Sequence, residues 1–238
     1  MKTLAILAVA VSVAVAFPGG ARAGAILPTL TIDASSSVPG GDVLHLTPTL
    51  VSPGGGVFLA HVEATTSSYS LVMDLQLHAD PSISGSFSLT NLSGSTQTFT
   101  VGASMSTAPF GGPTTYSGSY GDATFTDTSG NGDVTLSSAV FYQALIDAAI
   151  VAQRGSFTQN AFGGSGISGT ISQEAFGPTG GGPGGSSIAI KFPGFSLTAG
   201  DKVETPFTFS VVPEPGTTSL LAGIGAIFLA RALRSRSV

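Results

Sequence analysis

The segment from residue 127 to residue 133 places an oxygen-bearing side chain at every second position, a spacing that can hold a hard cation. A glycine at the sixth position permits the sharp turn that such a loop needs. The twelfth position is Ser138, where an EF-hand needs a bidentate glutamate, and this excludes an EF-hand. The alternative is a metal-free hairpin turn, because Asn-Gly and Gly-Asp are turn formers. The candidate ligands of a looser calcium site are Asp127, Ser129, Asn131 and Asp133.

Other patterns that could carry chemistry fail on their context. The segment 164–169 has the spacing of a dinucleotide-binding turn, but no acidic residue lies near position 189. His45, His61 and His78 have no local ligand spacing, and we expect them to be surface or lightly packed residues. The chain has no cysteine, which excludes disulfides, thiolate metal sites and cysteine nucleophiles. We therefore predict a protein that is not an enzyme and whose only candidate cofactor is calcium.

Charge is scarce and unevenly distributed. Charged residues make up 9% of the chain, against roughly 25% in an average soluble domain. Between Gly24 and Val212 there are three basic and twelve acidic residues, a formal charge of −9. An acidic body argues against nucleic acid as a partner. The 33 glycines and abundant Ser and Thr are typical of exported β-proteins with short strands and tight turns.

Apolar residues recur at every second position over many short stretches, which predicts strands with one buried face. Glycine or proline separates the stretches, so we predict an all-β fold, an antiparallel β-sandwich, with a barrel as the alternative. Pro206 predicts an edge strand or a broken one, and the segments 161–169 and 177–187 are predicted loops. The predicted buried faces include Tyr69, Leu71, Met73, Leu75, Leu77, Ile83, Phe87, Leu89, Phe99, Val101, Phe125, Ile188, Ile190, Phe192, Val203, Phe207, Phe209 and Val211.

Two features of the body leave alternatives open. The stretch 139–153 fits a helical stripe and also fits a strand, and propensity alone slightly favours a helix. Tyr116 and Tyr120 lie in a Gly-Ser-rich stretch and form the one plausible aromatic pair for a sugar-binding surface. A carbohydrate-binding β-sandwich is therefore the alternative function, and a secreted hydrolase is a further one.

Both ends of the chain have the composition of targeting segments. A basic start, a short apolar run and the small residues Ala21 and Ala23 are typical of a secretory signal peptide, with cleavage expected after Ala23. At the other end, the apolar run 217–230 spans about 21 Å as a helix, short of a hydrocarbon core of about 30 Å. We therefore expect a processed signal, with at most a transient membrane contact. Three arginines follow the run: Arg231, Arg234 and Arg236.

Pro213-Glu214-Pro215, the short apolar run and the terminal arginine cluster together resemble the PEP-CTERM sorting signal. The resemblance implies export across the inner membrane of a Gram-negative bacterium to the cell envelope, surface or extracellular matrix. It also implies two processing partners, signal peptidase and an exosortase-type membrane enzyme, and a link to exopolysaccharide or biofilm. Parts of the body resemble exported proteins of this kind more weakly. In those relatives the aspartate that matches Asp147 is followed by glycine in a hairpin, where this chain has Ala148. The likeness favours a hairpin over a helix at 139–153.

The expected organisation has three parts: a signal peptide over 1–23, a β-sandwich over 24–212 and a sorting tail over 213–238. The expected function is that of a non-enzymatic surface or matrix protein, and no catalytic residue comes with the resemblance.

Overall fold

The computed structural model describes residues 27–37 and 41–214, and within these residues every helix-or-strand element is a β-strand. All strand pairs are antiparallel, which confirms the predicted all-β antiparallel class. The expected signal peptide and apolar helix lie outside the described residues. Sheet A consists of β1 (Leu30–Ser36), β2 (Val43–Leu46), β7 (Gln97–Phe110), β10 (Asp133–Ser138), β11 (Tyr142–Ile146), β12 (Ala149–Arg154), β13 (Phe157–Phe162) and β16 (Gly185–Leu197). Sheet B consists of β3 (Val51–Gly54), β4 (Val57–Thr65), β5 (Tyr69–His78), β6 (Ser82–Asn91), β8 (Thr114–Tyr120), β9 (Ala123–Thr126), β14 (Ser168–Ile171), β15 (Glu174–Gly182) and β17 (Lys202–Pro213).

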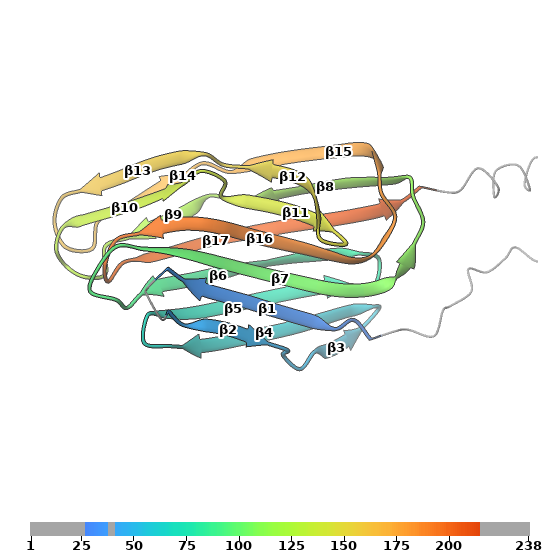
Figure 1. The fold of residues 1–238 in the computed structure, drawn as a ribbon, viewed down its shortest axis with the longest axis horizontal. Helices are drawn as coiled ribbons and strands as arrows, with labels where there is room; N and C mark the ends of the chain where they lie inside the picture. The colour runs from blue at the N-terminus through green and yellow to red at the C-terminus, as the bar shows by residue number, and fades with distance from the viewer. Residues whose placement is uncertain (1–26, 38–40, 215–238) are drawn as a thin grey trace, which may run out of the picture.

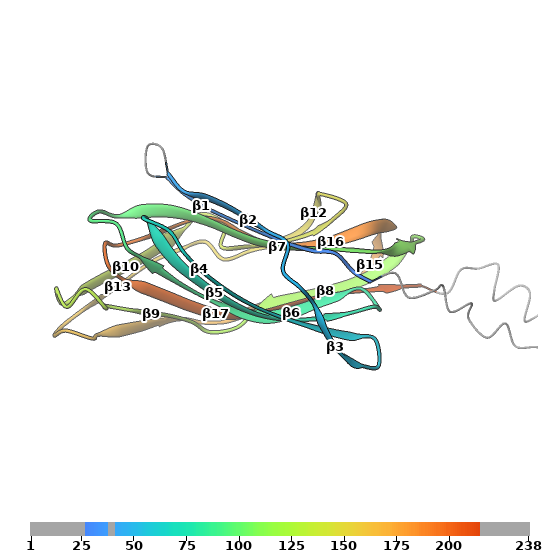
Figure 2. The ribbon, with the colours of Figure 1, turned by 90° about the horizontal axis from the view of Figure 1, so that it is seen from below.

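The two sheets lie face to face as the layers of a sandwich (Figures 1 and 2). Sheet A has the order β12-β11-β16-β7-β1-β2, and sheet B has the order β14-β9-β17-β6-β5-β4-β3. One long strand in each sheet has two partners placed end to end along one side. In sheet A, β16 pairs with β11 and then with β10, and in sheet B, β17 pairs with β9 and then with β8.

The structure corrects the prediction for Pro206. The strand β17 is an unbroken interior strand that pairs with β6 over residues 202–210. The break lies in its neighbours instead, because β9 pairs with residues 202–204 and β8 with residues 207–213. Pro206 lies at the gap between these two partners, where neither of them pairs with it. A proline without an N–H is therefore accepted in an interior strand.

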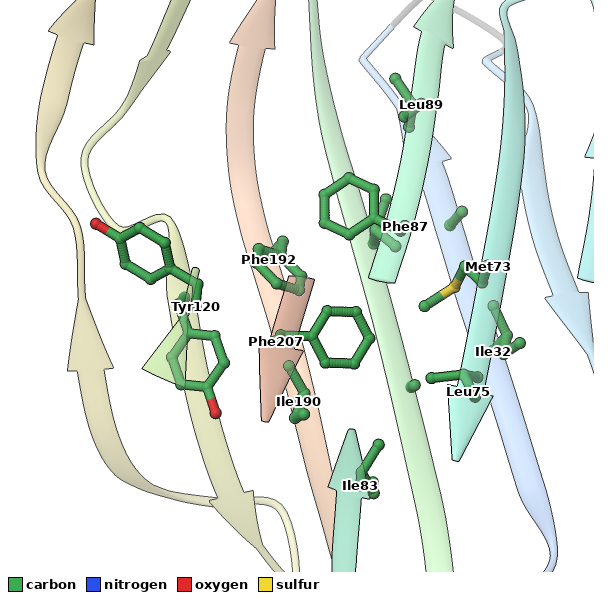
Figure 3. Packing of buried hydrophobic residues seen from close by; sticks show 14 of the residues in the cluster. Ile32, Met73, Leu75, Ile83, Phe87, Leu89, Tyr120, Ile190, Phe192 and Phe207 are labelled. Atoms are coloured by element: carbon green, nitrogen blue, oxygen red, sulfur yellow. The ribbon is translucent and has the colours of Figure 1, made fainter. Parts of the chain in front are cut away.

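The core lies between the sheets, and the predicted period-two faces line it. The five predicted core residues of β5 are at most 3% exposed, as alternation on a half-buried strand requires. Aromatic rings join the layers: the centroids of Phe87 on β6 and Phe192 on β16 lie 4.7 Å apart, with the rings edge to face. Figure 3 shows these two rings together with Phe207 and the aliphatic side chains of both sheets. Since the chain has no disulfide, this burial is the main source of its stability.

The ambiguous stretch 139–153 forms a hairpin of β11 and β12, as the family likeness favoured. Its two-residue turn is Asp147-Ala148, and both residues have positive φ, 45° and 65°. Two consecutive left-handed residues match the twist of a tight hairpin. The Asp147 carboxylate accepts hydrogen bonds from the N–H groups of Ser186 and Ser187, at 2.9 and 2.8 Å, and from both hydroxyls. These contacts fix the turn against the start of β16 and outweigh the weak helical propensity of the segment.

The left-handed turn makes a stability prediction. Replacing Ala148 by glycine should raise the free energy of unfolding by about 0.5–1 kcal/mol, because glycine has no Cβ to strain at φ 65°. Ala149→Gly, one residue further in β12, is the matched control and should lower stability by about 0.5–1 kcal/mol. Urea unfolding of the three proteins measures both effects. If the two variants change stability equally, the turn does not hold the left-handed conformation.

The glycine-rich segment 177–187 is not the predicted loop. Its first residues continue β15, and its last residues begin β16. Phe176 is buried, and β15 pairs with β8 through a register that shifts twice. Backbone pairing therefore orders a stretch that has little apolar area of its own. The other predicted loop, 161–169, is shorter than expected, since β13 runs to Phe162 and β14 begins at Ser168.

The sandwich has two distinct ends (Figure 1). At the proximal end, β1 begins at Leu30 and β17 ends at Pro213, so the two described termini of the domain lie at the same end. At the distal end lie the turns that join β4 to β5, β6 to β7, β9 to β10 and β16 to β17.

Candidate functional site

The predicted calcium ligands lie in the distal turn between β9 and β10. Asp127 is 2% exposed, and its carboxylate accepts hydrogen bonds from the Ser129 hydroxyl at 2.9 Å and the Gly130 and Gly132 N–H groups at 2.7 and 2.8 Å. Burial by itself would raise the pKa of Asp127, but these donors outweigh it and lower the pKa. Asn131 Oδ1 accepts the Asp133 N–H at 2.8 Å. Hydrogen bonds to these side-chain oxygens therefore stabilise the turn without an ion.

Calcium at this turn stays a prediction. Among residues 27–37 and 41–214, no three His, Cys, Asp or Glu side chains are grouped so that they could hold a metal ion. Ligation would therefore have to come mainly from hydroxyl, amide and backbone oxygens.

Two variants distinguish the structural role of the β9–β10 turn from calcium binding. Asp127→Ala should lower the Tm even in EDTA, because its hydrogen bonds need no ion. If calcium binds, CaCl₂ should raise the Tm of the wild type, and Asp133→Asn should remove that rise without changing the Tm in EDTA. The Asp133 side chain is exposed and thus suits this substitution. An unchanged wild-type Tm would contradict the calcium prediction.

A second distal cluster is centred on Asn91, which is fully buried at the end of β6. Its Nδ2 donates to the carbonyl oxygens of Ser95, Leu197 and Thr198 at 3.0, 2.9 and 2.9 Å. Its Oδ1 accepts from the N–H and the hydroxyl of Ser93 at 2.9 and 2.7 Å. One side chain therefore joins the β6–β7 turn to the β16–β17 turn. Sequence reasoning missed it, because Leu197 and Thr198 are more than a hundred residues away along the chain.

The β4–β5 turn, also at the distal end, is held by a second carboxylate, that of Asp42. It accepts from the Ser67 hydroxyl at 2.8 Å and from the Ser68 N–H at 2.9 Å. Hydrogen bonds from Ser67, Thr66 and Ser68 lower the pKa of Asp42 from 3.8 to about 2.

This shift predicts an acid-dependent loss of stability. The folded-state pKa is depressed, so the contribution is complete above about pH 4 and disappears as the pH falls through about 2. We expect the Tm of the wild type to fall more steeply than that of Asp42→Asn between pH 4 and pH 2. Calorimetry over this range is the measurement. Parallel pH profiles would show that Asp42 does not carry the effect.

The three histidines lie on the surface or are lightly packed, as predicted, and the structure does not bring them together. His45 Nδ1 lies 2.6 Å from Asp33 on sheet A. His61 lies on sheet B, with Nδ1 2.7 Å from Asp74 and Nε2 3.3 Å from Glu63. Hydrogen bonds to Asp74 and then Glu63 raise the pKa of His61. His78, also on sheet B, contacts Gln76 at 2.8 Å.

The proposed sugar-binding pair of tyrosines is wrong. Alternation along β8 turns both rings toward the core, where Tyr120 is fully buried against Phe141 at a centroid distance of 5.3 Å. Tyr116 is half-buried and donates its hydroxyl to Val151 O at 3.3 Å. With Tyr120 buried, the two rings do not form an exposed pair for a sugar while the domain is folded.

Two of the predicted sorting residues are described, and both belong to the folded domain. Strand β17 runs through Pro213, one residue past the expected boundary, and the Glu214 N–H donates to Pro113 O at 3.1 Å. Glu214 Oε1 accepts the Thr115 hydroxyl at 3.1 Å. Pro215, Arg231, Arg234 and Arg236 lie outside the described residues, as do Ala21 and Ala23 at the expected cleavage site. Within 27–37 and 41–214, the chain forms no helix long and apolar enough to cross a membrane.

No family model matches the chain, and a search of curated proteins finds no match either. The structure itself defines the class of protein as a two-layer, all-β antiparallel domain. The turns at its distal end are held by Asn91, Asp127 and Asp42.

Proposed function

We propose that this chain is an exported, non-enzymatic protein of the cell surface or extracellular matrix, delivered by a signal peptide and a PEP-CTERM-type tail. The proposal takes signal peptidase and an exosortase-type membrane enzyme as its processing partners, and the envelope of a Gram-negative bacterium as its location. Exopolysaccharide or biofilm matrix is the proposed surrounding.

The observation that carries the proposal is the position of the two ends. Strand β1 begins and β17 ends at the proximal end of the sandwich (Figure 1). A leader and a tail attached there leave the outer faces of both sheets and the distal turns free of the processing machinery. A body without cysteine also needs no oxidative folding after export.

The structure sharpens the truncation that tests this proposal. A cut at residue 212 would remove the Glu214 contacts to Pro113 and Thr115, so the chain should stop after Glu214. We expect this variant to fold but to be lost from the surface fraction of its native host. Mass spectrometry of the mature termini should show removal of residues 1–23 from both proteins. A variant with Arg231, Arg234 and Arg236 changed to glutamine keeps the full length, so it shows whether shortening the chain alone causes the loss. If the truncated protein gives surface display and biofilm equal to those of the wild type, the proposal is contradicted.

A further inference from the structure

We infer that the outer face of sheet A binds an uncharged polysaccharide chain in a trough that lies across β7 and β16. The trough has a volume of about 490 Å³. Strand β1 and the β11–β12 hairpin flank β7 and β16 in Figure 1, and the hairpin stands above them in Figure 2. The side chains that line the trough from these strands include Asp33, Ser35, Thr100, Leu145, Ser187 and Lys191.

Strand register places a polar row across this face. Asp33 on β1 and Lys191 on β16 are both paired with Gly102 on β7, one on each side. Directly opposite residues of an antiparallel pair point to the same face, so both charged side chains face outward. Gly102 has no side chain to fill the space between them. The two backbones are separated by two strand spacings, about 9.5 Å, a span that an oligosaccharide can bridge.

The two charged groups have complementary hydrogen-bonding roles. The Asp33 carboxylate only accepts, and His45 Nδ1 holds it at 2.6 Å. The Lys191 ammonium only donates, is exposed, and has no carboxylate within ion-pair distance among residues 27–37 and 41–214. Sugar hydroxyls donate and accept, so one chain can satisfy both groups. The hydroxyls of Ser35, Thr100 and Ser187 add partners along the trough.

Charge favours an uncharged chain over the other occupants. The trough contains one carboxylate and one ammonium, while the body carries a formal charge of −9, which repels a polyanion. A second copy paired through this face by twofold symmetry would meet the hollow with the same hollow and leave an unfilled void. The described lining contains no aromatic ring, so each contact is weak, and affinity comes from repeated binding along a polymer.

Affinity electrophoresis of the full chain in a mild detergent, through gels that contain soluble mixed-linkage β-glucan, dextran or alginate, tests the inference. We expect retardation by at least one of the two neutral polymers and none by alginate. The double variant Asp33→Asn, Lys191→Gln should raise the Kd roughly tenfold. Gly102→Leu should do the same without removing a polar group. The atoms nearest to a Cβ there are Ile190 O at 3.4 Å, Lys191 Cγ at 3.8 Å and Lys191 Cα at 4.0 Å, which are van der Waals distances, so the fold should accept it.

The matched control is Asp74→Asn, Lys202→Gln, which removes the same charges from the outer face of sheet B and should leave retardation unchanged. Near-identical circular dichroism melts would show that all variants fold. Absence of retardation by both neutral polymers, retardation by alginate alone, or equal retardation of the trough variants and the control would each overturn the inference. The inference rests on the proposed function for its matrix setting. The gel assay needs no sorting, so its failure is distinct from a failure of the truncation experiment.

Discussion

Replacing Asn91 by leucine should lower the free energy of unfolding by about 3–5 kcal/mol. The variant removes the donor that three carbonyl groups share, a buried one at Leu197 and two partly buried ones at Ser95 and Thr198, and each buried group left without a partner costs about 1–3 kcal/mol. It also frees Ser93, whose N–H and hydroxyl lose their acceptor. For a domain of this size, the expected fall in Tm is roughly 10 °C. Urea and thermal unfolding measure the two quantities.

Two controls test whether the loss comes from the donor. Asn91→Asp keeps the shape and the acceptor oxygen but replaces the donor by a charge that faces carbonyl oxygens, so it should destabilise at least as strongly at neutral pH. Leu92→Ala changes the exposed neighbouring residue and should alter stability by less than about 0.5 kcal/mol. A loss below about 1 kcal/mol for Asn91→Leu would contradict the role assigned to this side chain.

Phe192→Ala is expected to lower the free energy of unfolding by about 3–5 kcal/mol, the usual range for a buried aromatic residue. The Phe192 ring is 1% exposed and lies between rings of both layers, with centroids 4.7 Å from Phe87, 5.2 Å from Phe141 and 5.5 Å from Phe207. Its removal leaves a cavity that the paired strands on either side cannot close. The measured quantity is the denaturant midpoint at unchanged m-value.

The chain offers a matched control in Phe162, a phenylalanine at the end of β13 that is 67% exposed. Phe162→Ala removes the same atoms from a position in contact with water and should change stability by less than about 0.5 kcal/mol. Equal losses in the two variants would show that the sheets do not pack through Phe192.

The alternation of apolar residues was sufficient to predict the layers. Side chains on a strand alternate between its two faces, so a face such as Tyr69, Leu71 and Met73 can be assigned without knowing the neighbouring strands. The same rule, applied to β8, would have placed Tyr120 in the core, but the Gly-Ser-rich composition suggested an exposed stretch instead. Pairing with β17 on one side and β15 on the other orders it.

The distal contacts and the trough could not be predicted in this way. Asn91 is part of a formal glycosylation sequon in the sequence, yet it is buried and bonded to carbonyls of a turn that follows it by more than a hundred residues. Asp33 and Lys191 are 158 positions apart, and register with Gly102 places them on one row. Register between distant strands depends on the whole sheet, so no local pattern reports it.

The sequence by itself determined the strand class, the identity of most core residues, the acidic and cysteine-free character of the body, and the likeness of its tail to a sorting signal. These properties depend on residue types and on the recurrence of apolar residues at every second position, both of which can be read from short stretches of the chain. The tertiary structure alone decided which turns meet at the distal end, why Pro206 is accepted inside β17, and that a charged pair flanks a glycine on sheet A. Each of these depends on which strands are neighbours, and the packing of the two sheets against one another sets that order.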